Sequence, residues 1–272
     1  MKLLISTDIE GVAGIYNPEQ TRMGNGEYER ARRLMTQEAN AAISGAFDAG
    51  AEVVFVNDSH GDFRNLISSE LDPRAQAVQG KPRQLGMMAG VDFGVDTVAF
   101  VGYHAKAKTS GILAHTINGF AFARIVINGV EYGEAGLYGA LAAEFGVPVA
   151  FASGDDVFID ETRPLFPGAT FVQTKSAAGN TTGCSLSPEA SCAAIRSGLA
   201  AALRAIPKRP EFTLTAPLAV RLQTQTPALA DLFCLWPTLE RVAPDAIAFS
   251  ATRMQDVVRT LNALSVMSAT LR

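Results

Sequence analysis

Four short apolar segments recur in the first 155 residues of the chain, and each leads directly into polar side chains. They cover residues 1–5, 52–56, 97–102 and 149–153. Such runs are too short for buried helices and are typical of strands that are covered on both faces of a parallel sheet. The pattern therefore predicts a sheet whose strands all end in polar residues.

Helical periodicity separates the first two of these segments. Apolar side chains recur at helical spacing from Tyr28 to Ala49, and Gly50 marks the end of the helix. A strand, a helix and a strand in this order predict parallel pairing through a right-handed crossover. Further helices are expected at residues 83–89, 134–145 and 188–205, and a loop at residues 179–183. We therefore expect an α/β fold with a mainly parallel, Rossmann-like sheet flanked by helices.

Two later stretches depart from this alternation of strands and helices. Asn128 and Gly129 lie between apolar segments and supply the positive φ angles of a tight turn, so a β-hairpin insertion is expected there. Beyond Pro207 the pattern changes to strands at 212–225 and 246–249 and helices at 227–233 and 254–264. We expect an α/β metal-binding catalytic domain at residues 1–206, with a smaller α+β subdomain at residues 207–272 packed on it.

The charge and the cysteine content argue against several partners. The 272-residue chain has a formal net charge of −4 and no basic run beyond residues 30–33, so a nucleic acid partner is not expected. No segment approaches the roughly 18 apolar residues of a membrane span, so no membrane partner is expected either. Cys184, Cys192 and Cys234 suit neither a disulfide framework nor a zinc knuckle. We expect a cytoplasmic protein.

The polar residues that follow the strands include metal-ligand types. Asp8 and Glu10 project to the same side of an extended backbone after the first strand, and His60 and His104 follow the second and third. The carboxyl ends of parallel strands meet at one edge of a sheet, so these side chains are expected to lie together. Completed by a later carboxylate such as Glu134, they form a mixed nitrogen and oxygen site suited to Zn²⁺, Mn²⁺ or Co²⁺.

Five ligands are more than one catalytic zinc ion needs, because such an ion keeps an open position beside about three protein groups. Two ions fit better, and a carboxylate such as Asp8 could bridge them, activate water and polarise a carbonyl group. This is hydrolytic chemistry. His115 is the one imidazole left over, and a proton-transfer or intermediate-stabilising role is expected for it.

Five segments in the first half of the chain resemble, in order and spacing, the successive motifs of the DppA-type D-aminopeptidases. They are Ser6–Gly11, Asn57–Gly61, Gly102–His104, Ala114–Thr116 and Asn128–Glu134. The resemblance implies a site with two zinc ions and a catalytic histidine. In it Asp8 bridges the ions, Glu10 and His104 bind one, His60 and Glu134 bind the other, and His115 is catalytic.

The same resemblance implies an activity and an assembly. It implies a zinc aminopeptidase that acts on short peptides with N-terminal D-alanine or glycine, assembled as a decamer of two stacked pentameric rings. Within the last motif Glu131 competes with Glu134 for the position of the fifth ligand, and the Gly133-Glu134 context favours Glu134.

Two other functions compete with this interpretation. A magnesium-dependent phosphatase of the haloacid dehalogenase type is suggested by Asp8 and by the later Asp155-Asp156 pair, but that chemistry needs a second Asp in place of Glu10 and leaves the histidines unused. A non-catalytic metal-binding protein is the other alternative. Such a protein would need no residue like His115.

Overall fold

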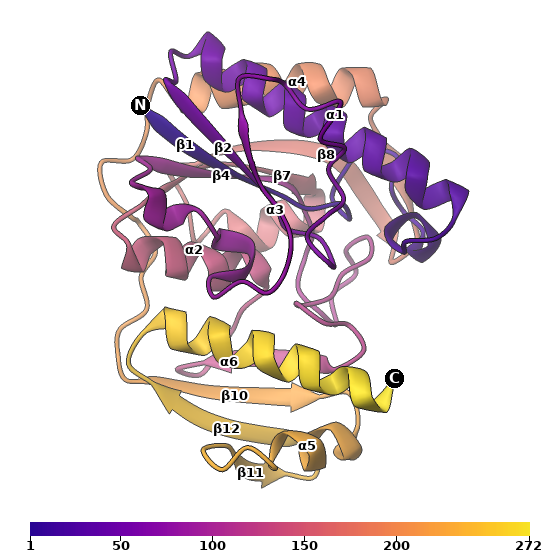
Figure 1. The fold of residues 1–272 in the computed structure, drawn as a ribbon, viewed down its shortest axis with the longest axis vertical. Helices are drawn as coiled ribbons and strands as arrows, with labels where there is room; N and C mark the ends of the chain where they lie inside the picture. The colour runs from indigo at the N-terminus through magenta and orange to yellow at the C-terminus, as the bar shows by residue number, and fades with distance from the viewer.

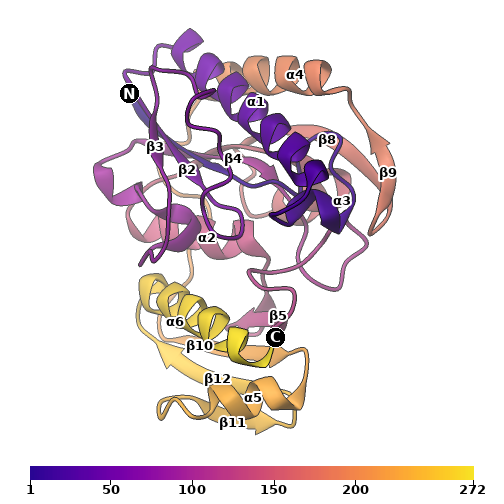
Figure 2. The same cartoon turned by 45° about the vertical axis from the view of Figure 1, so that its right-hand side comes forward.

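The computed structural model describes all residues 1–272 and shows two layers (Figure 1). The larger layer is built on a seven-stranded sheet, here sheet A, and the smaller on a five-stranded sheet, here sheet B. The C-terminal helix α6 (Met254–Met267) lies between them, as the view in Figure 2 also shows. No helix in the structure combines the length and the apolar character needed to cross a bilayer.

Sheet A has the strand order β3-β2-β1-β4-β7-β8-β9, and all pairs except β8 with β9 are parallel. This confirms the predicted α/β fold with a mainly parallel sheet. Its strands are β1 (Lys2–Thr7), β2 (Val53–Asp58), β3 (Gln76–Val78), β4 (Thr97–Tyr103), β7 (Val149–Asp155), β8 (Thr170–Gly179) and β9 (Thr182–Ser185).

Helices cover both faces of sheet A. α1 and α4 pack side by side on one face, while α2 covers the other face and contacts α6. The helices are α1 (Gly26–Asp48), α2 (Glu134–Glu144), α3 (Asp156–Thr162), α4 (Pro188–Ala202), α5 (Pro227–Phe233) and α6, with 3₁₀ turns at Pro18–Thr21, Gly86–Met88, Val91–Phe93 and Ser268–Leu271.

The alternation of side chains along β1 explains why its sequence is apolar throughout. Leu3 and Ile5 point into a core shared with α1 and α4, whereas Leu4 points into a second core shared with α2 and sheet B. Full burial of one such side chain contributes about 1.5–3 kcal/mol. A polar residue on either face of β1 would therefore be costly, which confines the polar side chains to the end of the strand.

Sheet B is antiparallel and joins two distant parts of the chain. Its order is β11-β12-β10-β5-β6, from β5 (Phe122–Ile127), β6 (Val130–Glu131), β10 (Leu218–Thr224), β11 (Glu240–Ala243) and β12 (Ala246–Ala251). The expected hairpin turns at Asn128 and Gly129, with φ angles of 52° and 85°. The hairpin belongs to sheet B, where β5 pairs with β10 and Ile127 lies opposite Val220. The division at residue 206 stays a prediction, but the smaller layer includes strands from before it.

Three further expectations need correction. Residues 83–89 were expected to be helical, but only Gly86–Met88 forms a 3₁₀ turn, since Gly86 has a φ angle of 53°. The expected loop at 179–183 is instead the tip of the β8–β9 hairpin. The expected strands at 212–225 reduce to β10, and α3 and β11 have no counterpart among the expected elements.

Candidate metal centre

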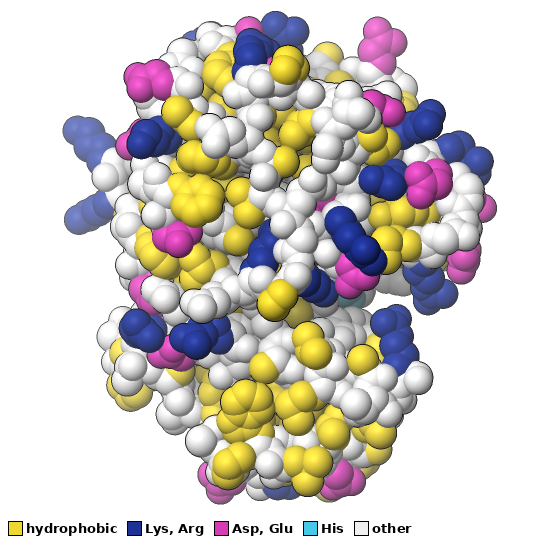
Figure 3. All heavy atoms as spheres, in the orientation of Figure 1, with side chains coloured by type: hydrophobic (Ala, Val, Ile, Leu, Met, Phe, Trp, Pro, Cys, Tyr) yellow, Lys and Arg dark blue, Asp and Glu magenta, His cyan; other side chains and the backbone are white.

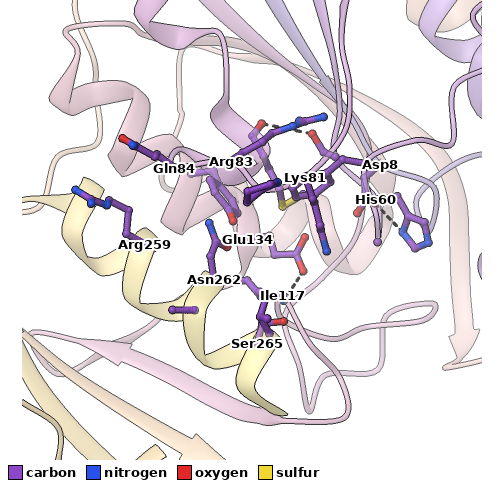
Figure 4. Close-up of a pocket in the computed structure, with 18 of the residues that line it drawn as sticks. Asp8, His60, Lys81, Arg83, Gln84, Ile117, Glu134, Arg259, Asn262 and Ser265 are labelled. Atoms are coloured by element: carbon purple, nitrogen blue, oxygen red, sulfur yellow. Dashed lines mark hydrogen bonds and ion pairs between the residues drawn. The ribbon is translucent and has the colours of Figure 1, made fainter. Parts of the chain in front are cut away.

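The candidate ligands converge at the carboxyl edge of sheet A, where β1, β2 and β4 end (Figure 4). Asp8 and His104 directly follow β1 and β4, His60 lies two residues beyond β2, and Glu134 is the first residue of α2. The side chains of Asp8, Glu10, His104 and Glu134 are at most 5% exposed. The structure therefore gathers all five sequence-predicted ligands in one buried place.

Two glycines allow the end of β1 to lie against the end of β4. The Gly11 amide donates to the Gly102 carbonyl oxygen at 2.7 Å, and a Cβ on Gly11 would lie only 1.9 Å from the Tyr103 carbonyl oxygen. Gly102 has a φ angle of +71°, and a Cβ there would lie 2.3 Å from the Asp8 carbonyl oxygen. The close approach brings Asp8 and Glu10 beside the residues that follow β4.

His60 directs its second ring nitrogen at two carboxylates. Its Nε2 lies 2.8 Å from the Thr21 carbonyl oxygen, which can only accept, so Nε2 carries the proton. Its Nδ1 lies 3.3 Å from Asp8 Oδ1 and 3.0 Å from Glu10 Oε2. In the neutral imidazole the Nδ1 lone pair therefore faces oxygen lone pairs.

His104 repeats this arrangement with its nitrogens exchanged. Nδ1 donates to the Ala105 carbonyl oxygen at 2.9 Å, which leaves the Nε2 lone pair 3.3 Å from Asp8 Oδ2 and 3.5 Å from Glu134 Oε2. A metal-binding histidine usually donates its other ring N–H to a carbonyl or carboxylate in this way. Asp8 contacts both His60 and His104 through different oxygens, which is the position that a bridging carboxylate requires.

Several buried atoms at this site have no hydrogen-bond partner. They are Asp8 Oδ2, Glu10 Oε2 and His104 Nε2. A buried polar atom without a partner costs about 1–3 kcal/mol, and more when the group is charged. All three atoms are acceptors that point at one another, so a cation placed between them would satisfy all three.

The pKa values in the cluster are shifted because carboxylates and imidazoles are buried side by side. Burial alone would lower the pKa of His60 and His104, but the carboxylates of Glu10 and Asp8 beside one, and of Glu134 and Asp8 beside the other, raise both pKa values well above the ordinary one. Burial opposes ionisation of Asp8 as well, yet the two imidazoles hold the pKa of Asp8 below its usual range. A metal cation would occupy the place of these protons, and the mixed nitrogen and oxygen donors suit zinc.

Possible ligand atoms fall into two overlapping groups. Those of Asp8, Glu10 and His104 lie within 4.8 Å of one another, and so do those of His104, His115 and Glu134. The donor set therefore has room for more than one ion. Glu131 lies outside both groups, because it is in β6 and pairs with Arg124 at 2.7 Å.

His115 lies in a constrained loop above the cluster. Its ring stacks on that of His104 with centroids 4.2 Å apart, and its Nδ1 donates to the Leu113 carbonyl oxygen at 3.0 Å. Leu113 and Ile117 on either side have φ angles of 55° and 60°, which only a well-supported loop tolerates. The Leu113 amide donates to the Asn180 carbonyl oxygen at the tip of the β8–β9 hairpin. His115 is 26% exposed, so its Nε2 is accessible from the adjoining cavity.

The residues that suggested a phosphatase have structural partners. Asp155 caps α3 by accepting from the Phe158 amide at 2.8 Å, and its other oxygen accepts from the Ile112 amide at 2.7 Å. Asp156 accepts from the Ala177 amide at 2.8 Å. Neither aspartate belongs to the groups of possible metal ligands, so the arrangement does not match a phosphatase site.

Sequence reasoning missed the buried side chain that supports the Glu10 turn. Lys175 donates from Nζ to the carbonyl oxygens of Glu10 and Ile15, the latter at 2.6 Å. Burial lowers the pKa of Lys175 to about 8. The available signal was a lone charged residue at the end of the apolar segment 171–175.

Sequence reasoning also missed the walls of the cavity beside the cluster. This inner cavity has a volume of about 540 Å³ and lies between the cluster, residues 81–84 and one face of α6 (Figure 4). A wider outer hollow of about 1200 Å³ adjoins it, and His60, Lys81 and His115 line both. No motif marks the α6 residues, because an amphipathic helix can bury its face in many ways.

Comparison with known proteins agrees with this geometry. The D-aminopeptidase family, peptidase M55, matches residues 1–263. A D-aminopeptidase of Bacillus subtilis (strain 168) is 36% identical over 188 residues, which is 69% of this chain and 68% of the relative. The solved structure of the Zn-dependent D-aminopeptidase DppA from Bacillus subtilis, described as a self-compartmentalizing protease, superposes with a TM-score of 0.94 at 29% identity and covers 99% of this chain and 98% of that one.

Proposed function

The chain belongs to the D-aminopeptidase family, peptidase M55, and from this membership we propose that it is an aminopeptidase with two zinc ions that hydrolyses short peptides. We propose that it takes substrates with an N-terminal D-amino acid such as D-alanine, or with glycine. The observation that carries the proposal is the arrangement of two histidines, His104, which is buried, and His60, whose side chain is 12% exposed. Each donates one ring N–H to a backbone carbonyl and turns the other nitrogen toward carboxylates.

The proposed ligands are Asp8, Glu10, His60, His104 and Glu134, with Asp8 shared between the ions. The placement of Asp8 between the two histidines and the unpartnered acceptor atoms support this assignment. When bound, zinc supplies Lewis-acid chemistry that polarises a carbonyl group and lowers the pKa of water.

We propose that His115 transfers protons at the substrate. Its Nδ1–H is fixed by the Leu113 carbonyl oxygen, so in the neutral ring Nε2 is the nitrogen that can accept a proton. Nε2 lies 3.8 Å from Glu134 Oε1, which the Ile117 amide holds at 2.6 Å. A general acid or base of this kind accelerates reactions about 10²–10⁴-fold.

We propose that the enzyme is cytoplasmic and assembles as a decamer of two stacked pentameric rings. The description of DppA as a self-compartmentalizing protease supports an oligomer with enclosed active sites. Large apolar side chains exposed on the single chain, Leu235, Trp236 and Val266, support burial in subunit contacts. Light scattering on the purified protein should give ten times the 28.7 kDa mass of the chain.

One set of assays distinguishes the proposed function from its rivals. Metal content is measured on the purified protein, followed by hydrolysis of D-alanyl and L-alanyl p-nitroanilide and of p-nitrophenyl phosphate. We expect about two zinc ions per chain and release of p-nitroaniline from the D-alanyl substrate. Phosphate release with magnesium would support the phosphatase, and bound metal without turnover would support a non-catalytic protein.

Substitution of single histidines tests the assigned roles. His115→Ala should keep the zinc and lower kcat about 10²–10⁴-fold. His104→Ala should lose zinc as well as activity, because its Nε2 points into the centre of the cluster. Metal content and kcat are measured on the same preparations. Unchanged peptide hydrolysis by His115→Ala would rule out the proposed proton transfer.

A further inference from the structure

The charges that line the inner cavity are unevenly distributed. Its only acidic residues are Asp8 and Glu134, which both belong to the metal cluster. The charged residues outside the cluster, Lys81, Arg83 and Arg259, are all basic. Figure 3 likewise shows Lys and Arg side chains around the groove between the two layers, where a histidine is just visible. For a chain of net charge −4 this basic wall is a local exception.

The Arg83 side chain is held by hydrogen bonds to the backbone, whereas the side chains of Lys81 and Arg259 donate no hydrogen bond within the protein. The Arg83 guanidinium donates to the carbonyl oxygens of Gly80 at 2.6 Å and Val78 at 3.0 Å. Lys81 has a 3.6 Å contact with half-exposed Asp62 and lies 5.0 Å from the centre of the Phe63 ring, and Arg259 has a 4.0 Å contact with Asp256 on its own helix. The Lys81 ammonium and the Arg259 guanidinium therefore keep donors free for a ligand.

We propose that the inner cavity binds the free C-terminal carboxylate of the substrate at Lys81 and Arg259, so that the enzyme selects short zwitterionic peptides. The inference rests on the proposed aminopeptidase function and adds the feature by which the substrate is recognised. The scissile bond has to lie at the metal cluster, and the C-terminal carboxylate of a short peptide then faces the basic wall of the same cavity. Arg and Lys are the usual partners of carboxylates in binding sites.

The spacing along α6 places Arg259 farther along the cavity than Ser265, while Lys81 lines the cavity from another part of the chain. Ser265 lies beside His115 and Ile117 in both cavities, and Arg259 precedes it by six residues, or about 9 Å at the rise of an α-helix. An extended peptide advances about 3.5 Å per residue. Lys81, which Figure 4 places near Asp8 and Glu134, suits the carboxylate of a dipeptide, and Arg259 suits that of a peptide one or two residues longer.

The test compares D-alanyl-D-alanine with D-alanyl-D-alaninamide, which lacks the negative charge. For the zinc-loaded enzyme kcat/KM should favour the acid at least about tenfold, the size expected for one charge-assisted hydrogen bond. Lys81→Met should lower this preference about tenfold, mainly through KM, and Lys81→Glu should reverse it. Arg259→Met should act on the tripeptide acid more than on the dipeptide. Arg253→Met, on the same helix but outside the cavity, should keep the wild-type preference.

A binding measurement separates this inference from the proposed function. Calorimetric titration of zinc-loaded His115→Ala with the same acid and amide gives the ratio of the two Kd values without turnover. Tighter binding of the acid supports the carboxylate site, and equal binding overturns it. If the wild-type enzyme hydrolyses neither peptide, the aminopeptidase proposal fails. If it hydrolyses both equally and Lys81→Glu does not change the ratio, only the carboxylate inference fails.

Discussion

Two buried charged clusters lie on either side of the Glu10 turn, and they treat their charges differently. In the candidate metal centre, carboxylate oxygens face imidazole lone pairs at 3.0–3.5 Å. In the second cluster, Glu38 of α1 accepts from the Ala13 amide at 3.0 Å and from the Ser191 hydroxyl at 2.7 Å, and Lys175 donates to backbone carbonyls. In the second cluster backbone and hydroxyl groups satisfy the charges, whereas in the first a proton or a metal cation is needed between each imidazole nitrogen and its carboxylates.

The way in which the buried charges are compensated distinguishes a candidate metal site from a structural polar network. Burial raises the pKa of Glu38 to about 7, so below that pH its carboxyl is neutral and its unpartnered Oε2 carries no charge. In the candidate metal centre the carboxylates instead raise the pKa of His60 and His104 well above the ordinary value, so each imidazole holds a second proton there unless a metal cation takes its place. Buried acids alone therefore do not indicate a metal ion. A metal ion is indicated where imidazole nitrogens, each with its other N–H bound to a carbonyl oxygen, face carboxylate oxygens.

Asp8→Asn tests the comparison most strongly. It removes the carboxylate that contacts both His60 and His104, so we expect zinc to be lost and kcat/KM to fall by at least about 1000-fold. Metal analysis and peptide hydrolysis on the same sample check this. Glu131→Gln is the matched control, because Glu131 pairs with Arg124 and should be replaceable without loss of zinc. Full zinc content in Asp8→Asn would mean that the opposed lone pairs are not the metal site.

Glu38→Gln tests the other cluster, through stability rather than activity. The folded-state pKa of about 7 lies above the ordinary 4.5, so the folded protein binds the extra proton and its stability falls as pH rises from 4.5 through 7. The shift of about 2.5 pKa units corresponds to at most about 3 kcal/mol. Gln stays neutral, so the variant should be more stable than the parent by about 1–3 kcal/mol at pH 9 and about equal to it at pH 4.5.

The measurement must be kept free of zinc, whose binding also depends on pH. Urea unfolding is therefore compared at pH 4.5 and pH 9 in the Asp8→Asn background, with and without Glu38→Gln. An equal difference between the two proteins at both pH values would show that Glu38 does not titrate near neutrality. Glu38 would then be an ordinary ionised carboxylate, and the distinction between the clusters would weaken.

The sequence predicts the candidate metal ligands better than the residues that pack around them, and the reason is topological. Parallel strands bring their carboxyl ends to one edge, so the positions of Asp8, His60 and His104 follow once β1, β2 and β4 are recognised. His115 was singled out as the one remaining imidazole and Glu134 as a later carboxylate, and the resemblance to a known family supported both. Their contacts with His104 are visible only in the structure.

The remaining parts depend on long-range packing that no local pattern specifies. Arg259 reaches the site only because β5 pairs with β10 and α6 is held between the two sheets. The apolar character of residues 122–127 predicts a strand but not its partner, so the pairing of the hairpin with β10 is visible only in the structure. Glu38 and Lys175 are 137 positions apart in sequence, and only the packing of α4 against both α1 and β8 brings them together.

Lys175→Met tests the link between the two clusters and should have the smallest effect. The ammonium group holds the Glu10 and Ile15 carbonyl oxygens, so its loss should loosen the turn that carries Glu10. Removal of a supporting hydrogen bond of this kind weakens metal binding about tenfold or somewhat more. We expect the zinc Kd to rise about tenfold while kcat at saturating zinc stays within a few fold of wild type. Competition with a chelator measures the Kd.

Exposed Lys208, replaced by Met, is the control for the loss of one positive charge from the chain. If Lys175 acted only through its charge near Asp8 and Glu10, zinc would bind more tightly without it, because a repelling cation is removed. Weaker zinc binding therefore means that the hydrogen bonds to the turn outweigh the repulsion. Tighter binding would show that the polar network and the metal centre are coupled by electrostatics rather than by the geometry of the Glu10 turn.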